Sequence, residues 1–199
     1  MSNEAIIEYP APGAGSTAWR TRDIVVAATI GVAFAVVFWF WNVTVWPATE
    51  GLFAFFPPAR NVVYGAWLMP AVLAPLVIRR PGAALFAEMV AAIVSALLGN
   101  QWGVDTLLSG FVQGAAAELV FALTLYRLWS LPVLGLAAVA SAAAAWVHDW
   151  AVWYQASSID VMGWVFVFMA GSALVLAAGG SAILWQALRR AGVLEGFPA

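Results

Sequence analysis

The segment from residue 79 to 103 (RRPGAALFAEMVAAIVSALLGNQWG) contains an apolar run of membrane-spanning length that includes one carboxylate, Glu88. Two arginines and a Pro-Gly pair precede the run, and a polar, aromatic GNQWG stretch ends it. An ionisable group inside hydrocarbon is costly, so it usually faces a bundle interior or a cavity. The segment therefore predicts a transmembrane helix on which Glu88 faces inward.

The spacing gives this helix two unlike faces. Small and polar residues recur at three- and four-residue steps and so share one side: they are Ala84, Glu88, Ala91, Ala92, Ser95 and Gly99. The other side is apolar and suits lipid or neighbouring helices: it carries Leu85, Phe86, Met89, Val90, Ile93, Val94, Leu97 and Leu98.

The composition extends this interpretation to the whole chain. Hydrophobic residues make up 64% and charged residues 9%, against roughly 25% charged in a soluble domain. A spanning helix needs about 20 apolar residues, and six such runs occur, at 23–46, 61–78, 82–99, 104–128, 131–154 and 161–188. We predict an all-α integral membrane protein, a bundle of six transmembrane helices within residues 20–192. Residues 1–19 are predicted to be a disordered cytoplasmic tail, and residues 193–199 a second cytoplasmic tail.

The eight basic residues are all arginines, and they divide unevenly between the two sides of the predicted bundle. Arg60 lies on one side, and the other side holds Arg20, Arg22, Arg79, Arg80, Arg127, Arg189 and Arg190. Cytoplasmic loops carry an excess of positive charge, so both termini are predicted to lie in the cytoplasm. The outside then holds the 47–60 loop, the GNQWGVD turn and the 155–160 turn.

The first outer loop, residues 47–60, is long and carries three phenylalanines and three prolines. So much aromatic surface should be buried somewhere. The loop is either a lid over an outward-opening cavity or a segment lying in the membrane interface.

Polar and aromatic residues gather at the outer ends of the predicted helices. Rings can stack on a ligand, while amides, carboxylates and an imidazole fix its orientation through hydrogen bonds. Such a set suits a small, flat, partly aromatic ligand. With Glu88, the candidate ligand-binding residues are Trp39, Asn42, Trp46, Gln101, Trp102, Asp105, Gln113, His148, Asp149, Trp153 and Tyr154.

Each candidate also has a structural interpretation. Tryptophans at helix ends commonly form the interfacial belt. Asp105 is also suited to cap a helix N-terminus, His148 and Asp149 to form a polar pair between helices, and Glu88 to brace two helices. Glu118 follows Gly110 and Gly114 at four-residue steps on a packing face, and we interpret it as structural.

A ridge of small residues, Ala27, Gly31 and Ala35, lies in the inner half of the first predicted helix. Such ridges allow helices to approach closely. The ridge either packs inside the bundle or docks another membrane protein.

Several function classes find no support in the sequence. With one histidine, no cysteine and no HExxH motif, a zinc protease is not indicated and no metal site is expected. Disulfides are excluded as well. There is no GxSxG motif for a serine hydrolase and no Walker motif for ATP hydrolysis. No basic stripe outside the membrane flanks points to nucleic acid.

The chain resembles the substrate-binding S components of energy-coupling factor (ECF) transporters, specifically the YkoE family linked to thiamine or its hydroxymethylpyrimidine precursor. The most specific segment is PGAALFAEMVAAIVSALLGNQWG at 81–103, and RTRDIVVAATIGVAFAV at 20–36 comes next. Length, six spans, cytoplasmic ends, the small-residue ridge and a capping first outer loop extend the resemblance over nearly the whole chain.

The resemblance implies an outward-facing vitamin binder in the bacterial cytoplasmic membrane. It implies as partners a transmembrane coupling protein and two ATPase subunits, which use the ATP, so no cofactor is expected on this chain. Thiamine-type S components use a carboxylate towards the aminopyrimidine, a histidine and stacking tryptophans. The candidates of these types are Glu88, His148, Trp102 and Trp153, with Asp105 as the alternative carboxylate.

Two other functions remain open from the sequence. One is a membrane-embedded enzyme that uses His148 and Asp149 as an acid–base pair. The other is an assembly subunit that binds no ligand.

Overall fold

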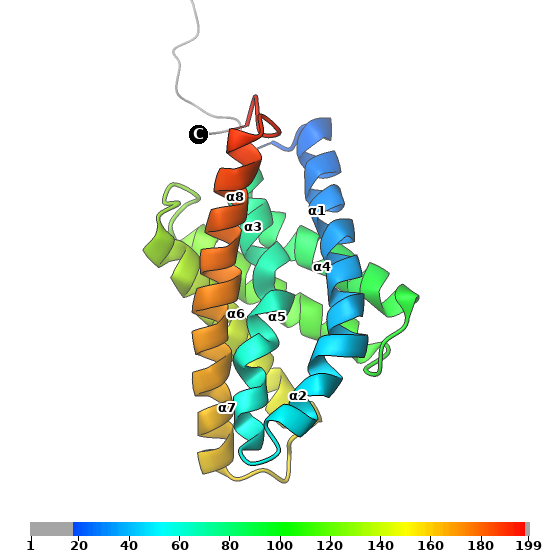
Figure 1. Ribbon diagram of the computed structural model, residues 1–199. Helices are drawn as coiled ribbons and strands as arrows, with labels where there is room; N and C mark the ends of the chain where they lie inside the picture. The colour runs from blue at the N-terminus through cyan, green and yellow to red at the C-terminus, as the bar shows by residue number, and fades with distance from the viewer. Residues whose placement is uncertain (1–17, 198–199) are drawn as a thin grey trace, which may run out of the picture.

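The first membrane-crossing element is one continuous helix of 32 residues, Thr21–Leu52. It begins as α1 (Thr21–Phe40), widens into a π-helical stretch, η1 (Trp41–Val45), and ends as α2 (Trp46–Leu52). The computed structural model describes residues 18–197, and within this range helices and turns occur without any strand. Figure 1 shows this helix running from blue to cyan and bending at α2.

The remaining helices follow the first crossing along the chain. Their bounds are η2 (a 3-10 helix, Pro57–Leu68), α3 (Met69–Ile78), α4 (Ala83–Leu98), α5 (Asp105–Leu123), α6 (Leu131–Val152), α7 (Ile159–Ser172), η3 (a π-helical stretch, Ala173–Gly180) and α8 (Ser181–Arg190). The last three form one crossing of 32 residues, Ile159–Arg190. Figure 1 shows η2 and α3 at the front between the first and last crossings, with α4, α5 and α6 behind them.

All six predicted apolar runs form helices. Five helices among the described residues are long and apolar enough to cross a membrane, whereas α4 is apolar but has only 16 residues. The chain is therefore an all-helical membrane protein with several crossings. The most enclosed element is α3, where every residue from Pro70 to Ile78 is buried, as expected for a helix that is apolar all round.

The two faces predicted for α4 are confirmed. Ala84, Glu88, Ala91, Ala92 and Ser95 are buried, whereas Ile93, Leu97 and Leu98 on the other face are exposed. Gly99 departs from the prediction, because it already belongs to the exposed turn after the helix. The buried face of small residues lets α1, α3 and α5 approach α4 closely.

The ridge of Ala27, Gly31 and Ala35 packs inside the bundle, so the prediction that it docks a partner is wrong. All three residues are buried. A Cβ atom at Gly31 would lie 2.7 Å from the Cβ atom of Val90 and 2.9 Å from the carbonyl oxygen of Ala87, both on α4. The ridge is small because α4 lies against it.

The predicted outer loop at 47–60 is largely helical. The first helix continues through Pro47 to Leu52 and bends there (Figure 1), because a proline inside a helix lacks the N–H donor and crowds the preceding turn. The 3-10 helix η2 starts at Pro57. Its aromatic side chains behave differently from one another. Phe56 packs edge-on against Trp164 and Phe168, whereas 84% of Phe55 is exposed.

The described ends of the chain pack onto the bundle. The indole nitrogen of Trp19 donates to the carbonyl oxygen of Pro81 at 2.7 Å, and its ring packs edge-on against Phe86. Leu194 and Phe197 join the same apolar cluster. The predicted tails, residues 1–19 and 193–199, therefore include residues that pack onto the bundle. Residues 1–17 and 198–199 lie outside the described residues.

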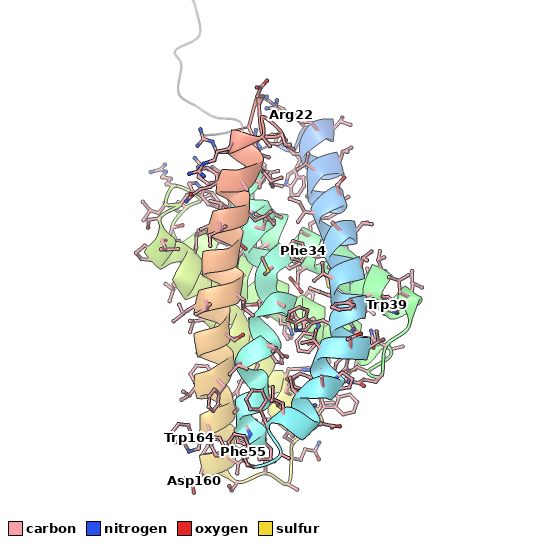
Figure 2. The ribbon with its side chains drawn as sticks, in the orientation of Figure 1. Arg22, Phe34, Trp39, Phe55, Asp160 and Trp164 are labelled. Atoms are coloured by element: carbon pink, nitrogen blue, oxygen red, sulfur yellow. The ribbon has the colours of Figure 1, made fainter. Side chains whose placement is uncertain are left out.

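The end of the bundle that holds both described chain ends is rich in arginine. Figure 2 labels Arg22 there, at the opposite end from Phe55 and Asp160. Buried Asp23 of α1 accepts hydrogen bonds from the backbone nitrogen of Arg20 at 3.0 Å and from Nε of Arg80 at 3.2 Å. Arg60 instead pairs with Glu50, 3.4 Å away, near the other end. The uneven arginine pattern of the sequence thus corresponds to two different ends of the fold.

Glu118 has the structural role that its spacing indicated. Its carboxylate accepts hydrogen bonds from the backbone nitrogens of Gly82 at 2.6 Å and Ala84 at 2.9 Å, at the start of α4. The hydroxyl of Tyr126 donates to the same carboxylate at 2.7 Å. The first N–H groups of a helix have no partner within it, so α5 supplies the cap that α4 lacks.

Candidate functional site

A cavity of about 90 Å³ opens in the half of the bundle away from most of the arginines. It is formed where η1, the start of α2, η2, the middle of α4, the start of α5 and the end of α6 meet. It is lined by Phe38, Asn42, Trp46, Tyr64, Trp67, Glu88, Ala92, Ser95, Trp102, Asp105, Thr106, Ser109, Gly110, Gln113, Asp149, Trp153 and Tyr154.

Aromatic rings form one side of the cavity. The rings of Trp46 and Trp102 both lie against Trp67, with centroids 5.2 Å and 5.7 Å away. Tyr64 packs edge-on against Trp67 at 5.1 Å. Tyr64 and Trp67 are three residues apart on a 3-10 helix, which has three residues per turn, so they lie one above the other. The arrangement offers ring edges and faces to a flat ligand.

The π-helical stretch η1 directs an amide into the same space. Asn42 is buried, its carbonyl oxygen accepts from the indole nitrogen of Trp67 at 2.9 Å, and its amide nitrogen donates to Ser95 at 3.4 Å. Short π-helical insertions are frequent at functional sites, because the extra residue re-aims side chains. Asn42 thereby fixes the position of Trp67.

Two carboxylates form a polar wall at the junction of α5 and α6. Asp105 accepts from the indole nitrogen of Trp153 at 2.8 Å, and Asp149 accepts from the hydroxyl of Tyr64 at 2.9 Å. His148 lies between them, with Nε2 3.1 Å from Asp105 and Nδ1 3.0 Å from Asp149. Carboxylate oxygens that keep free lone pairs can accept further hydrogen bonds from a ligand.

An amide and a hydroxyl continue this polar wall along α5. The amide nitrogen of Gln113 donates to Ser109 at 2.6 Å and lies 3.5 Å from the hydroxyl of Tyr64. Its backbone carbonyl accepts from Ser141 of α6 at 2.9 Å. Gln113 therefore joins α5 to both η2 and α6.

Glu88 combines the two roles considered for it. Its side chain lines the cavity, and only 1% of the residue is exposed. It also accepts a hydrogen bond from the backbone nitrogen of Ala71 at 3.1 Å, in the first turn of α3. Glu88 thus braces α3 against α4 and presents a carboxyl group to the cavity.

Most of the predicted ligand-binding residues converge on this cavity. Asn42, Trp46, Glu88, Trp102, Asp105, Gln113, Asp149, Trp153 and Tyr154 all line it. Asp105 does so as the first residue of α5, and the alternative that it caps this helix is wrong. Asn100 supplies the local hydrogen bonds instead, accepting from the backbone nitrogens of Trp102 and Gly103, both at 2.9 Å.

Three predicted residues lie elsewhere. Trp39 is 40% exposed on the outer side of α1 and, as Figure 2 shows, lies away from Phe34, which is buried in the bundle. Gln101 lies in the exposed turn between α4 and α5. His148 lies behind the two carboxylates and is not among the lining residues.

The sequence prediction missed several lining residues. Tyr64 and Trp67 were not recognised because they lie inside an apolar run, although two polar-tipped aromatics three residues apart were a usable signal. Ser95 was noted only as part of the small and polar face of its helix, and Ser109 was not among the candidates. Phe38, Ala92, Thr106 and Gly110 carry no signal that separates them from ordinary packing residues. Among residues 18–197, no group of three or more His, Cys, Asp or Glu side chains is placed to hold a metal ion.

Comparisons with known proteins agree with one another. Residues 22–144 match the family model described as the permease component of an ABC-type cobalt transport system. A curated protein of Bacillus subtilis (strain 168), described as a putative HMP/thiamine permease protein YkoE, is 41% identical over 135 residues, which cover 66% of this chain and 64% of that relative. The match therefore spans slightly less than two thirds of the relative's length.

A solved structure, described as the crystal structure of an S-component of an ECF transporter, has the same fold. It superposes with a TM-score of 0.84 at 36% sequence identity, and the match covers 90% of each chain.

Proposed function

Because the chain belongs to the family described as the permease component of an ABC-type cobalt transport system, and to the S components of ECF transporters, we propose that it captures a vitamin for uptake. The proposed ligand is thiamine or its hydroxymethylpyrimidine precursor (HMP), the ligands in the name of the relative from Bacillus subtilis. The family consists of transport components rather than enzymes, so His148 and Asp149 are not assigned an acid–base reaction.

The observation that carries this proposal is the pairing of aromatic rings with carboxylates in one small cavity. An aminopyrimidine is flat, so it can lie against Trp46, Trp67 and Trp102. Its amino group donates hydrogen bonds, which Asp105 and Asp149 can accept across the cavity. A cavity with both features also speaks against an assembly subunit without a ligand.

We further propose how the protein sits in the membrane and obtains energy. Six helices cross the cytoplasmic membrane, the arginine-rich end and both termini face the cytoplasm, and the cavity opens outward. A transmembrane coupling protein and two ATPase subunits are the proposed partners. They supply the ATP hydrolysis, and this chain needs no cofactor of its own.

A fluorescence titration of the purified protein tests the ligand. Four of the twelve tryptophans line the cavity (Trp46, Trp67, Trp102 and Trp153), so thiamine or HMP should quench the emission and raise the melting temperature. Trp102→Phe should reduce the quenching. Trp39→Phe is the matched control, because it removes an indole that lies outside the cavity, and it should leave the quenching unchanged.

Two results would count against this function. The first is wild-type protein that shows neither quenching nor a melting shift with both ligands. The second is quenching that disappears in Trp39→Phe but persists in Trp102→Phe.

A further inference from the structure

The imidazole of His148 is held by a carboxylate on each of its two nitrogens. Nδ1 lies 3.0 Å from Oδ1 of Asp149 on the same helix, and Nε2 lies 3.1 Å from Oδ1 of Asp105 on α5. Only 5% of the histidine side chain is exposed, against 16% for Asp149 and 20% for Asp105. The ring therefore lies behind the carboxylates, and the carboxylates face the cavity.

The number of protons in this group follows from its hydrogen bonds. A neutral imidazole donates through one nitrogen and accepts through the other. With two ionised carboxylates, the accepting nitrogen would face a second acceptor without any proton between them. Both short contacts are favourable only when His148, Asp105 and Asp149 together carry one proton more than a neutral imidazole and two carboxylates. The net charge of the three side chains is then −1.

The additional proton belongs on the ring. In water, histidine holds a proton with a reference pKa of about 6.5, against about 3.9 for aspartate. The second oxygens of both carboxylates already accept from neutral donors, Trp153 at 2.8 Å and Tyr64 at 2.9 Å. Both carboxylates therefore already act as hydrogen-bond acceptors through these oxygens.

We propose that His148 is an imidazolium that positions Asp105 and Asp149 and sets the charge of this cavity wall at −1. The other ionisable groups that line the cavity are Glu88 of α4, Tyr64 of η2 and Tyr154 of the turn after α6, and the Arg60–Glu50 pair lies near Tyr154. His148 thereby tunes how strongly the site prefers a cationic ligand to a neutral one. This selectivity role rests on the proposed function, whereas the charge state of the ring does not.

Nitrogen NMR of the wild-type protein tests the charge state without any ligand. The chain has a single histidine, so tag-free protein labelled with ¹⁵N-histidine reports on this ring alone. The reference pKa of histidine is roughly 6.5. At a pH about one unit above this value, both ring nitrogens should show the chemical shifts of protonated nitrogens. One protonated and one unprotonated nitrogen would overturn the proposal.

A selectivity measurement tests the positioning role. Thiamine carries a permanently cationic thiazolium ring, and HMP is neutral. Removing the imidazolium with His148→Gln leaves two ionised carboxylates and no cation beside them. Binding should therefore shift in favour of thiamine by about tenfold relative to HMP. This magnitude is that of the lost repulsion between imidazolium and thiazolium, acting through an effective dielectric of roughly 20. His148→Lys restores the cation and should return the ratio of the two dissociation constants to within about twofold of wild type.

A matched control separates this effect from loss of structure. Glu118→Gln alters a partly buried hydrogen-bonded network outside the cavity, so it should leave the ratio unchanged. A ratio unaltered in His148→Gln, or altered equally in His148→Gln and His148→Lys, would overturn the selectivity role. Wild-type protein that binds neither ligand would instead contradict the proposed function, and the NMR result would still decide the charge of the ring.

Discussion

At the scale of single residues, two glutamates, buried Glu88 and partly buried Glu118, act as caps for helices other than their own. Glu88 accepts from Ala71 in the first turn of α3, and Glu118 accepts from Gly82 and Ala84 at the start of α4. Backbone N–H groups without partners are costly inside a membrane. A carboxylate from the neighbouring helix satisfies them and also favours the positive end of the helix dipole. Each acid therefore has a stabilising role that does not depend on a ligand.

Tyr126 completes the cap at Glu118. Its backbone and that of Leu125 adopt left-handed conformations, with φ of 55° and 54°, which turns the chain back towards α5. Burial, together with the hydrogen bond to and the charge of Glu118, raises the pKa of the Tyr126 hydroxyl above its usual value. The hydroxyl therefore stays protonated and keeps donating over the whole range in which the glutamate is ionised.

Removing the carboxylate of Glu118 should destabilise the protein without altering ligand recognition. We expect Glu118→Ala to lower the free energy of unfolding by about 1.5–3 kcal/mol, the range for a hydrogen bond to a charged group. Glu118→Gln keeps one acceptor oxygen and should cost less. Thermal unfolding in detergent measures both variants. Stability equal to wild type in Glu118→Ala would show that water caps α4 equally well.

At the scale of elements, a close crossing joins η2 to the last helix. The backbone nitrogen of Gly65 donates to the hydroxyl of Ser172 at 2.8 Å, and that hydroxyl donates to the carbonyl oxygen of Val62 at 2.7 Å. A Cβ atom at Gly65 would lie 2.3 Å from the carbonyl oxygen of Ser172. The position of η2, and with it that of Tyr64 and Trp67, depends on this contact.

A methyl group at Gly65 should therefore force η2 away from α7. We expect Gly65→Ala to destabilise the fold by about 1–3 kcal/mol, the cost of overpacking a tight interior, and to weaken ligand binding by displacing Trp67. Gly51→Ala is the control, because nothing lies within 4 Å of a Cβ atom there. Melting temperatures and ligand titrations of both variants provide the test, and equal behaviour of the two would contradict the role of the crossing.

The existence of the helices could be predicted from the sequence, but their local winding could not. Apolar runs of membrane-spanning length determine where helices form. Whether a stretch such as Trp41–Val45 winds as a π-helix depends on neighbours that only the folded bundle brings close. The same limit left two interpretations open for the ridge around Gly31, since small residues suit the protein's own helix and a partner's helix equally well.

The residues of the candidate site that could be predicted are those with polar side chains in an apolar part of the sequence. Asp105, Asp149 and Gln113 are polar groups in apolar surroundings, and such groups seldom occur inside a membrane without a partner or a cavity. Trp39 and Trp46 look alike in sequence, yet one is 40% exposed and the other 8%. Their difference arises from the helix face and the π-helical stretch between them, which spacing alone does not reveal.

At the scale of the whole molecule, the two ends of the bundle differ in chemistry. One end carries most of the arginines, several of them over aromatic rings, such as Arg22 over Phe197 at 5.0 Å and Arg189 over Trp185 at 4.8 Å. The other end carries the cavity and the two aspartates. A positively charged end is retained in the cytoplasm, so the proposed orientation presents the cavity to incoming vitamin.

Cysteine labelling can measure this orientation directly, because the chain contains no cysteine of its own. Ala156 and Ala191 are exposed alanines at opposite ends of the last crossing, Ile159–Arg190. In intact cells, a membrane-impermeant maleimide should label Ala156→Cys and should reach Ala191→Cys only after the membrane is opened. The reverse pattern would invert the proposed topology, and labelling of both in intact cells would contradict six crossings.

The length of α4 determines how deep the cavity entrance lies. Its 16 residues span about 24 Å at 1.5 Å per residue, whereas the hydrocarbon core of a bilayer is about 30 Å thick. In the proposed orientation, the turn that carries Trp102 therefore ends short of the outer surface. The bilayer must thin locally there, or water and headgroups must descend to meet the turn. A vitamin would then enter through a dimple in the membrane, below the general level of the lipid headgroups.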